Sequence, residues 1–470
     1  MLFSSVTFVA FFLPAFLAAY YLVPKKLTTA RNAVLLLFSI VFYAWGGVRY
    51  LALIFASIAV NYLAGLLLGR LTAKGARRAA LAVCVVCNLA LLGVFKYANF
   101  VTSTLASWGV LASATSIALP IGISFYTFQG MSYVFDVYKG DAASAKNPLT
   151  VALYISLFPQ LVAGPIVRYT DIERELTERA YSTSEFTSGA VRFAMGFGKK
   201  LILANAVGEI ADEVFSRTGT SLLTAPLAWL GAIAFALQIY FDFSAYSDMA
   251  IGLGKMIGFH FNENFDYPYI SSSVTEFWRR WHISLSSWFR DYVYIPLGGN
   301  RRGVPRQIFN LFVVWALTGM WHGANWTFIV WGLYYGALLI VEKFVLRKAL
   351  EKVPRVFRHI VTLFLVLIGW VLFRSETLGG AWTYICSMFG ASGSGAAETV
   401  YLIREYAVEL VIALVAVLPL KKLALARFER NGKTPVWAQI AVVASALFVF
   451  ALAYMKLVSG SFAPFIYFQF

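Results

Sequence analysis

Residues 50–69 read YLALIFASIAVNYLAGLLLG, a run of 20 residues without a charged side chain. A helix needs about 20 apolar residues to cross a bilayer core that is about 30 Å thick. Further apolar runs fall at 2–23, 32–45, 79–95, 222–241, 324–342, 358–373, 405–420 and 436–457. The sequence therefore predicts an all-α protein that crosses a membrane many times.

The composition supports lipid as the main surrounding of the chain. Of the 470 residues, 60% are hydrophobic and 13% are charged, whereas soluble domains are about half apolar and a quarter charged. The net charge of +16 comes from Lys and Arg in short loops between apolar runs. This is the pattern of cytoplasmic loops rather than of a nucleic-acid site. The basic clusters fall at 25–31, 70–78, 343–358 and 421–433.

Other apolar stretches are interrupted by Gly, Pro or charges, which favours short or re-entrant segments around a cavity. They fall at 111–138, 149–167, 186–210, 245–261 and 306–321. We find no internal repeat of the transporter kind and no linker, so residues 1–470 are expected to form one domain. Cys84 and Cys87 form a C-x-x-C motif, but no second pair completes a zinc framework, so no metal is expected.

His322 lies between two apolar runs, in the stretch TGMWHGANWT at 318–327. A helix over 306–321 would place it deep in the membrane, where Gly319 and Gly323 let helix backbones approach closely. An ionisable side chain at that depth indicates a functional site. The structural alternative is a neutral histidine that is hydrogen-bonded inside a helix bundle.

His282 lies in the stretch EFWRRWHISLSSWFRD at 276–291. If this stretch is one helix, Trp278, His282, Leu285 and Phe289 share one face and basic residues share another. The helix could lie flat on the membrane surface. Alternatively it lines a site and offers arginines to phosphates. The arginines that could hold an anionic cofactor are Arg279, Arg280, Arg290, Arg301, Arg302 and Arg306.

Asp242 and Asp248 lie in an otherwise apolar segment. Gln238, Asp242 and Tyr246 repeat at four-residue spacing, which places them on one helix face. Buried acids need partners. Asp242 could orient a histidine or an arginine, but structural support of the bundle is the favoured interpretation.

At these motifs the chain resembles the membrane-bound O-acyltransferase family, and most of all its bacterial branch for alginate-type and peptidoglycan-type O-acetylation. The resemblance runs over essentially the whole chain. The matching stretches are LFSS at 2–5, LPIGISF at 119–125, FPQLVAGPI at 158–166, YFDFSAYSD at 240–248, NFDYPY at 264–269, the block 278–300, MWHGANW at 320–326 and PFIYFQF at 464–470.

The resemblance implies a ring of about 11 or more membrane helices around a funnel, with re-entrant and interfacial helices. It makes His322 the family's essential histidine and His282 the second one. It implies acetyl-CoA as the acyl donor, bound from the cytoplasm, and a polysaccharide acceptor. It also implies an extracytoplasmic, esterase-like acetyltransferase as partner and a place in the bacterial cytoplasmic (inner) membrane.

A mechanism follows from this resemblance as a hypothesis. Neutral His322 would act as general base toward a hydroxyl, a contribution of about 10² to 10⁴ in rate. Asn325, Trp326 or His282 could donate to the developing oxyanion. The mechanism requires that a cytosolic thioester and an outward-delivered alcohol both reach position 322. Transient acylation of His322 is equally compatible with the sequence.

Three other functions are kept as alternatives. Intramembrane Asp and His also suit ion relays in a transporter or channel. A second alternative is D-alanyl transfer to teichoic acid, by a sibling branch that is less similar in these motifs. A third is a non-catalytic scaffold that recruits envelope enzymes.

Overall fold

The computed structural model describes residues 1–428, 435–460 and Phe465. The end of the basic cluster 421–433 and most of the motif 464–470 lie outside these residues. The described part of the chain forms helices and contains no strand. Its contacts group into two units, residues 1–193 with 246–263 and residues 194–245 with 264–470.

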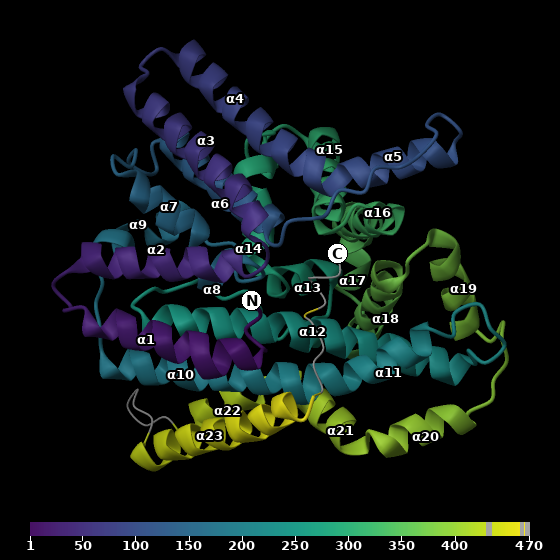
Figure 1. Cartoon of the computed structure of the whole chain (residues 1–470). Helices are drawn as coiled ribbons and strands as arrows, with labels where there is room; N and C mark the ends of the chain where they lie inside the picture. The colour runs from purple at the N-terminus through teal and green to yellow at the C-terminus, as the bar shows by residue number, and fades with distance from the viewer. Residues whose placement is uncertain (429–434, 461–464, 466–470) are drawn as a thin grey trace. The chain divides into compact units, whose positions relative to one another are not determined.

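The first unit holds the N-terminal helices (Figure 1). Its elements are η1 (Thr7–Phe12), α1 (Leu13–Leu22), α2 (Thr28–Ala44), η2 (Val48–Tyr50), α3 (Leu51–Arg70), α4 (Lys74–Leu92), η3 (Gly93–Tyr97), α5 (Ala98–Ser107), α6 (Ile123–Lys139), α7 (Pro148–Ser156), α8 (Phe158–Leu161), α9 (Tyr169–Thr177) and most of α10 (Thr183–Gly198).

The second unit contains both histidines of the predicted site. Its elements are η4 (Lys199–Ala204), α11 (Asn205–Phe215), most of α12 (Ala225–Met256), η5 (Pro268–Ile270), α13 (Val274–Arg280), α14 (Ile283–Phe289), η6 (Arg290–Tyr294), α15 (Val304–His322), α16 (Trp326–Val341), η7 (Glu342–Leu346), α17 (Arg347–Leu350), α18 (Arg355–Arg374), α19 (Leu378–Met388), α20 (Ala397–Glu405), α21 (Ala407–Ala416), α22 (Leu420–Phe428) and α23 (Val436–Val458).

Six helical stretches of the described chain are long and apolar enough to cross a membrane. They are Val48–Arg70, Lys74–Ser107, Ala225–Met256, Trp326–Leu350, Arg355–Arg374 and Val436–Val458. Three shorter apolar helices are Thr7–Leu22, Thr28–Ala44 and Ala407–Ala416. The helices and the six candidate spans of the described residues confirm the prediction of an all-α, multi-pass membrane protein.

The run 50–69 forms the span that its composition predicts, within Val48–Arg70. Its helix α3 packs beside α4 in the first unit (Figure 1). The side-chain amides of Asn61 and Asn88 donate to each other, over 3.0 and 3.1 Å. Cys84 is buried against Asn61. This polar cluster ties two membrane helices together, because hydrocarbon offers these amides no alternative partner.

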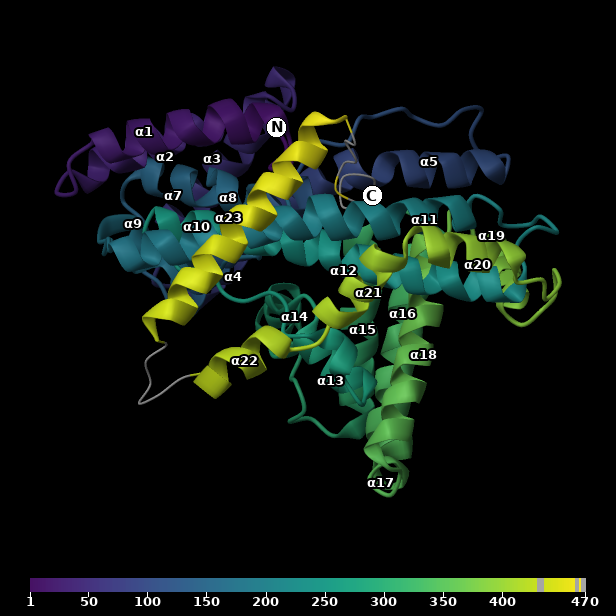
Figure 2. The same ribbon diagram turned by 90° about the horizontal axis from the view of Figure 1, so that it is seen from below.

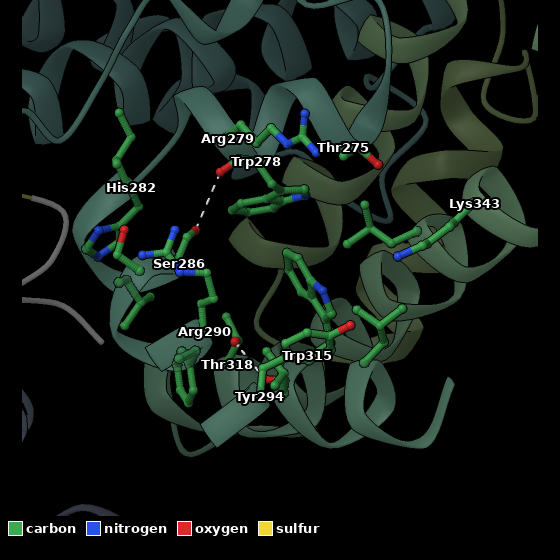
Figure 3. Close-up of a pocket in the computed structure, with 17 residues that line it drawn as sticks. Thr275, Trp278, Arg279, His282, Ser286, Arg290, Tyr294, Trp315, Thr318 and Lys343 are labelled. Atoms are coloured by element: carbon green, nitrogen blue, oxygen red, sulfur yellow. Dashed lines mark hydrogen bonds between the residues drawn. The ribbon is translucent and has the colours of Figure 1, made fainter. Parts of the chain in front are cut away.

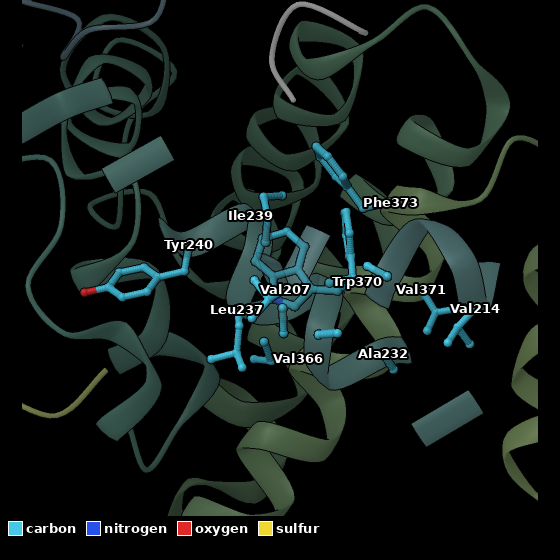
Figure 4. Packing of buried hydrophobic residues seen from close by; sticks show 14 of the residues in the cluster. Val207, Val214, Ala232, Leu237, Ile239, Tyr240, Val366, Trp370, Val371 and Phe373 are labelled. Carbon is cyan, nitrogen blue, oxygen red and sulfur yellow. The ribbon is translucent and has the colours of Figure 1, made fainter. Parts of the chain in front are cut away.

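The core of the second unit combines aliphatic side chains with aromatic rings, among them Tyr240, Trp370 and Phe373 (Figure 4). Trp281, Trp331 and Trp370 are each at most 1% exposed. The ring centroids of Trp281 and Trp370 lie 4.8 Å apart, and those of Trp331 and Trp370 lie 6.3 Å apart. Helices α16 and α18 run side by side in Figure 2 and contact each other. This packing fixes the scaffold on which the two histidines are placed.

Helices α15 and α16 approach closely at a pair of glycines. A Cβ atom on Gly319 would lie 2.4 Å from the backbone oxygen of Phe328, and one on Gly332 would lie 2.4 Å from that of Trp315. The sequence-based expectation that Gly319 allows close helix packing before His322 is therefore confirmed. The contact sets the position of the end of α15.

Gly319→Ala is expected to destabilise the protein by about 1 to 3 kcal/mol, because the added methyl group forces α15 and α16 apart. Thermal unfolding of detergent-solubilised protein measures the change. Gly379→Ala is the matched control, since a Cβ at Gly379 meets nothing within 4 Å. An unchanged melting temperature for the Gly319 variant would contradict the packing argument.

Candidate active site

His282 lies at a break between two short helices. The expectation of one helix over 276–291 is wrong here, because α13 ends at Arg280 and α14 begins at Ile283. His282 adopts left-handed backbone angles, φ 45° and ψ 54°, which are strained for a residue with a Cβ. The backbone oxygen of Asn264 accepts the N–H of Ile283 over 3.0 Å. Contacts from a distant segment therefore hold the break.

The His282 imidazole is 1% exposed and has polar contacts on one side. Its Nδ1 lies 3.1 Å from Oδ1 of Asn264. The same Oδ1 accepts from the hydroxyl of Ser284 over 2.9 Å and from the Ser284 backbone N–H over 3.2 Å. The ring centroid lies 4.7 Å from that of Phe243 and 5.7 Å from that of Trp321, both edge to face.

His322 is the last residue of α15 and is 6% exposed. Aromatic rings surround it, with centroid distances of 4.9 Å to Trp331, 5.1 Å to Trp321 and 5.4 Å to Phe373. Its centroid lies 6.4 Å from that of His282. One histidine lies at the end of α15 and the other at the break between α13 and α14. Although they are 40 positions apart in the sequence, they therefore meet in one site.

Beside the histidines is a cavity of about 510 Å³ within the second unit. Its walls are largely apolar and include the indoles of Trp278 and Trp315 (Figure 3). His282 and Thr318 line it. His322, one helical turn beyond Thr318, is not among its lining residues. The cavity thus reaches His282 directly, whereas a passage to position 322, which the mechanism requires, stays a prediction.

Three cations line the same cavity, namely Arg279, Arg290 and Lys343. Figure 3 shows His282 and Lys343 at opposite ends of it. Arg290 also pairs with Asp291 over 2.6 Å. Carboxylates do not occur among the lining residues, so the cavity favours an anionic molecule with an apolar part. Lys343 is absent from the predicted set of cofactor-binding residues, because the sequence analysis assigned it to the cytoplasmic basic cluster 343–358.

The other predicted arginines lie elsewhere in the second unit. Arg280 pairs with Asp266 over 3.0 Å and with Glu276 over 3.1 Å. Arg301 and Arg302 are exposed in the loop before α15 and do not line the cavity. Of the predicted set, Arg279 and Arg290 are thus the residues that the structure brings to the cavity.

Of the predicted oxyanion donors, Asn325 makes contacts that stabilise local structure. Asn325 caps α16, because its Oδ1 accepts the N–H of Thr327 over 3.3 Å. Its amide nitrogen donates to the backbone oxygen of Glu376 over 2.9 Å. Trp326 begins α16 with an exposed side chain. Neither arrangement directs a donor at His282, whose polar partners are Asn264 and Ser284.

Asp242 forms a buried ion pair that the sequence did not reveal. Its Oδ1 lies 2.6 Å from Nζ of Lys200, and the two side chains are 2% and 3% exposed. The ring of Phe465 lies 4.7 Å from the same Nζ. The interpretation of Asp242 as structural support is favoured by this pair. Within the described ranges, no cluster of three or more His, Cys, Asp or Glu residues could hold a metal ion.

Comparisons with known proteins agree with the motifs. The family model of the membrane-bound O-acyltransferase family, MBOAT, matches residues 142–373. "Probable alginate O-acetylase AlgI" of Azotobacter vinelandii is 40% identical and that of Pseudomonas putida is 42% identical, each over the full length of both chains. "Peptidoglycan O-acetyltransferase" of Helicobacter pylori is 33% identical over 84% of this chain and 80% of its own.

Proposed function

Because this chain belongs to the membrane-bound O-acyltransferase family, we propose that it moves an acetyl group from cytosolic acetyl-CoA toward hydroxyl groups of an envelope polysaccharide or exopolysaccharide. Full-length relatives named as alginate O-acetylases favour an alginate-type acceptor. Membership in a family of acyltransferases argues against the alternative of a transporter or channel without acyl chemistry. The resemblance drawn from the motifs is confirmed.

The observation that carries this proposal is the meeting of two buried histidines beside a cavity with cationic and apolar walls. Acyl transfer from a thioester needs a group that accepts the hydroxyl proton and a site that holds an anionic donor. Burial lowers the pKa of His282, which lies outside the candidate spans, to about 3. A histidine of this kind is neutral at physiological pH and therefore keeps a nitrogen lone pair that can accept a hydrogen bond.

In the proposed reaction, His322 takes the hydroxyl proton as the acceptor oxygen attacks the thioester carbonyl. The new C–O bond forms, the C–S bond breaks, and the proton passes to the leaving thiolate. A neutral imidazole contributes about 10² to 10⁴ in rate in such a role. Arg279, Arg290 and Lys343 would hold the phosphates of the donor. Lys343 also belongs to the predicted cytoplasmic cluster 343–358, which supports entry of the donor from the cytoplasm.

The remaining parts of the proposal concern the surroundings of this site. We place the chain in the bacterial cytoplasmic (inner) membrane, as one functional domain over residues 1–470. The ring of about 11 or more membrane helices around a funnel stays a proposal, to which the six candidate spans and three shorter apolar helices of the described residues would contribute. An extracytoplasmic, esterase-like acetyltransferase would complete the transfer to the polymer. The roles of Asn325 and Trp326 toward the oxyanion, and of Arg301 and Arg302 toward the donor, stay predictions.

The test is acetyl transfer by the purified protein in proteoliposomes. We expect thiol release from acetyl-CoA that depends on an added polysaccharide, and acetyl esters on that polymer. Alginate, peptidoglycan fragments and teichoic acid with a D-alanyl donor should be compared, alone and with envelope extract as a source of the partner. Absence of thiol release and of acetyl ester in every combination would exclude the proposal.

Removing a cavity cation is expected to weaken donor binding. Lys343→Ala or Arg279→Ala should raise KM for acetyl-CoA roughly 10-fold, with kcat little changed, because a charge-assisted hydrogen bond to a phosphate is lost in ground and transition states alike. Steady-state kinetics measure both constants. Arg355→Ala is the matched control, since Arg355 is an exposed cation that does not line the cavity. Equal effects of all three variants would argue against a donor site here.

A further inference from the structure

The geometry around Asn264 determines which nitrogen of His282 carries hydrogen. The backbone N–H of Ser284 can only donate, and it points to the Asn264 side-chain atom that also faces Nδ1 of His282. That atom must therefore be the amide oxygen rather than the amide nitrogen. Because an amide oxygen only accepts, Nδ1 of His282 has to be the protonated nitrogen.

The second nitrogen of His282 then has a free lone pair. Nε2 is buried and has no hydrogen-bond partner among the described residues. The residue itself is 1% exposed and lines the cavity. A buried acceptor without a partner is costly, and one beside a cavity is well placed for a ligand's hydroxyl or thiol hydrogen. In this tautomer a neutral His282 has no N–H to donate to an oxyanion.

We propose that Asn264 is a positioning residue, which holds His282 in the Nδ1–H tautomer so that Nε2 is the hydrogen-bond acceptor of the active site. Ser284 supports it by occupying the remaining acceptor capacity of the Asn264 oxygen. The inference rests on the proposed acetyl transfer and deepens it, because it gives His282 an accepting role. Orientation of an imidazole through its other nitrogen is a general device of active sites.

The surroundings of His282 make this role sensitive to one added charge. The titratable or charged groups that share its site are His322 on α15, with ring centroids 6.4 Å apart, and the cations that line the same cavity, Arg279, Arg290 and Lys343. Among the described residues no carboxylate pairs with it. A carboxylate at position 264 would keep the Nδ1–H bond and would stabilise the imidazolium.

The test is the pH dependence of acetyl transfer in Asn264→Asp. The new charge raises the pKa of His282, so the neutral form is reached only at higher pH. The acid limb of the kcat/KM profile should therefore move to higher pH, with activity recovered as pH rises. Asn310→Asp is the matched control, since Asn310 is also fully buried in the second unit and its amide donates to Gly299 instead. Its acid limb should stay in place.

Asn264→Ala provides a second measurement that introduces no charge. The imidazole loses its anchor, and kcat per folded protein should fall at least about 10-fold, with KM less affected. An unshifted acid limb in Asn264→Asp, or wild-type kcat in Asn264→Ala, would overturn the positioning role. Loss of folded protein in both variants would assign Asn264 to folding and would also overturn it. Failure of the wild-type protein to transfer acetyl groups would instead refute the proposed function.

Discussion

Replacement of His322 by alanine is expected to abolish acetyl transfer while the amount of folded protein stays the same. The variant removes the group that takes the hydroxyl proton, which costs about 10² to 10⁴ in rate. The small alanine leaves the surrounding rings of Trp321, Trp331 and Phe373 to pack against each other. Acetyl ester formed per folded protein, from labelled acetyl-CoA in proteoliposomes, is the measurement.

The matched control is His260→Ala. His260 is a half-exposed histidine in the first unit whose Nδ1 lies 2.7 Å from Glu175, and nothing in the proposed chemistry involves it. Its activity should stay near that of the wild type. Wild-type activity in His322→Ala would remove the base from the mechanism. It would leave His282, which lines the cavity, as the candidate general base.

Sequence reasoning located His322 because it stands between two apolar runs, and His282 because it stands in an amphipathic stretch rich in Trp and Arg. It could not place Asn264 beside His282, since 18 positions separate them and the chain between them is neither one helix nor one strand. The break at His282 was missed for a similar reason. No Gly or Pro marks it, and the left-handed backbone is held by tertiary contacts from Asn264.

Hydropathy predicted most membrane helices, because an apolar run of sufficient length has few other stable states. It failed where polar residues interrupt a run. The expected segments 222–241 and 245–261 are one continuous helix up to Met256, namely α12. Asp242 lies at the expected gap, and its charge is matched by Lys200. A buried counterion on a separate element cannot be read from local composition, so the gap was inferred in error.

The Lys200–Asp242 pair gives the largest expected effect on stability. Asp242→Leu leaves a buried ammonium without its carboxylate and should destabilise the protein by about 3 to 5 kcal/mol. Lys200→Met should cost a similar amount for the same reason. The double variant Lys200→Met with Asp242→Leu replaces both charges by apolar groups and should be close to the wild type in stability.

Thermal unfolding in detergent, analysed as a double-mutant cycle, measures the coupling between the two positions. Glu351→Gln is the matched control, because it removes an exposed partner of Arg347 and exposed pairs contribute little. A double variant as unstable as either single variant would show that the loss comes from packing rather than from the unpaired charge. Restored stability with normal kcat in the double variant would identify Asp242 as structural support. Restored stability without activity would instead point to a role for Asp242 in orienting the groups of the reaction.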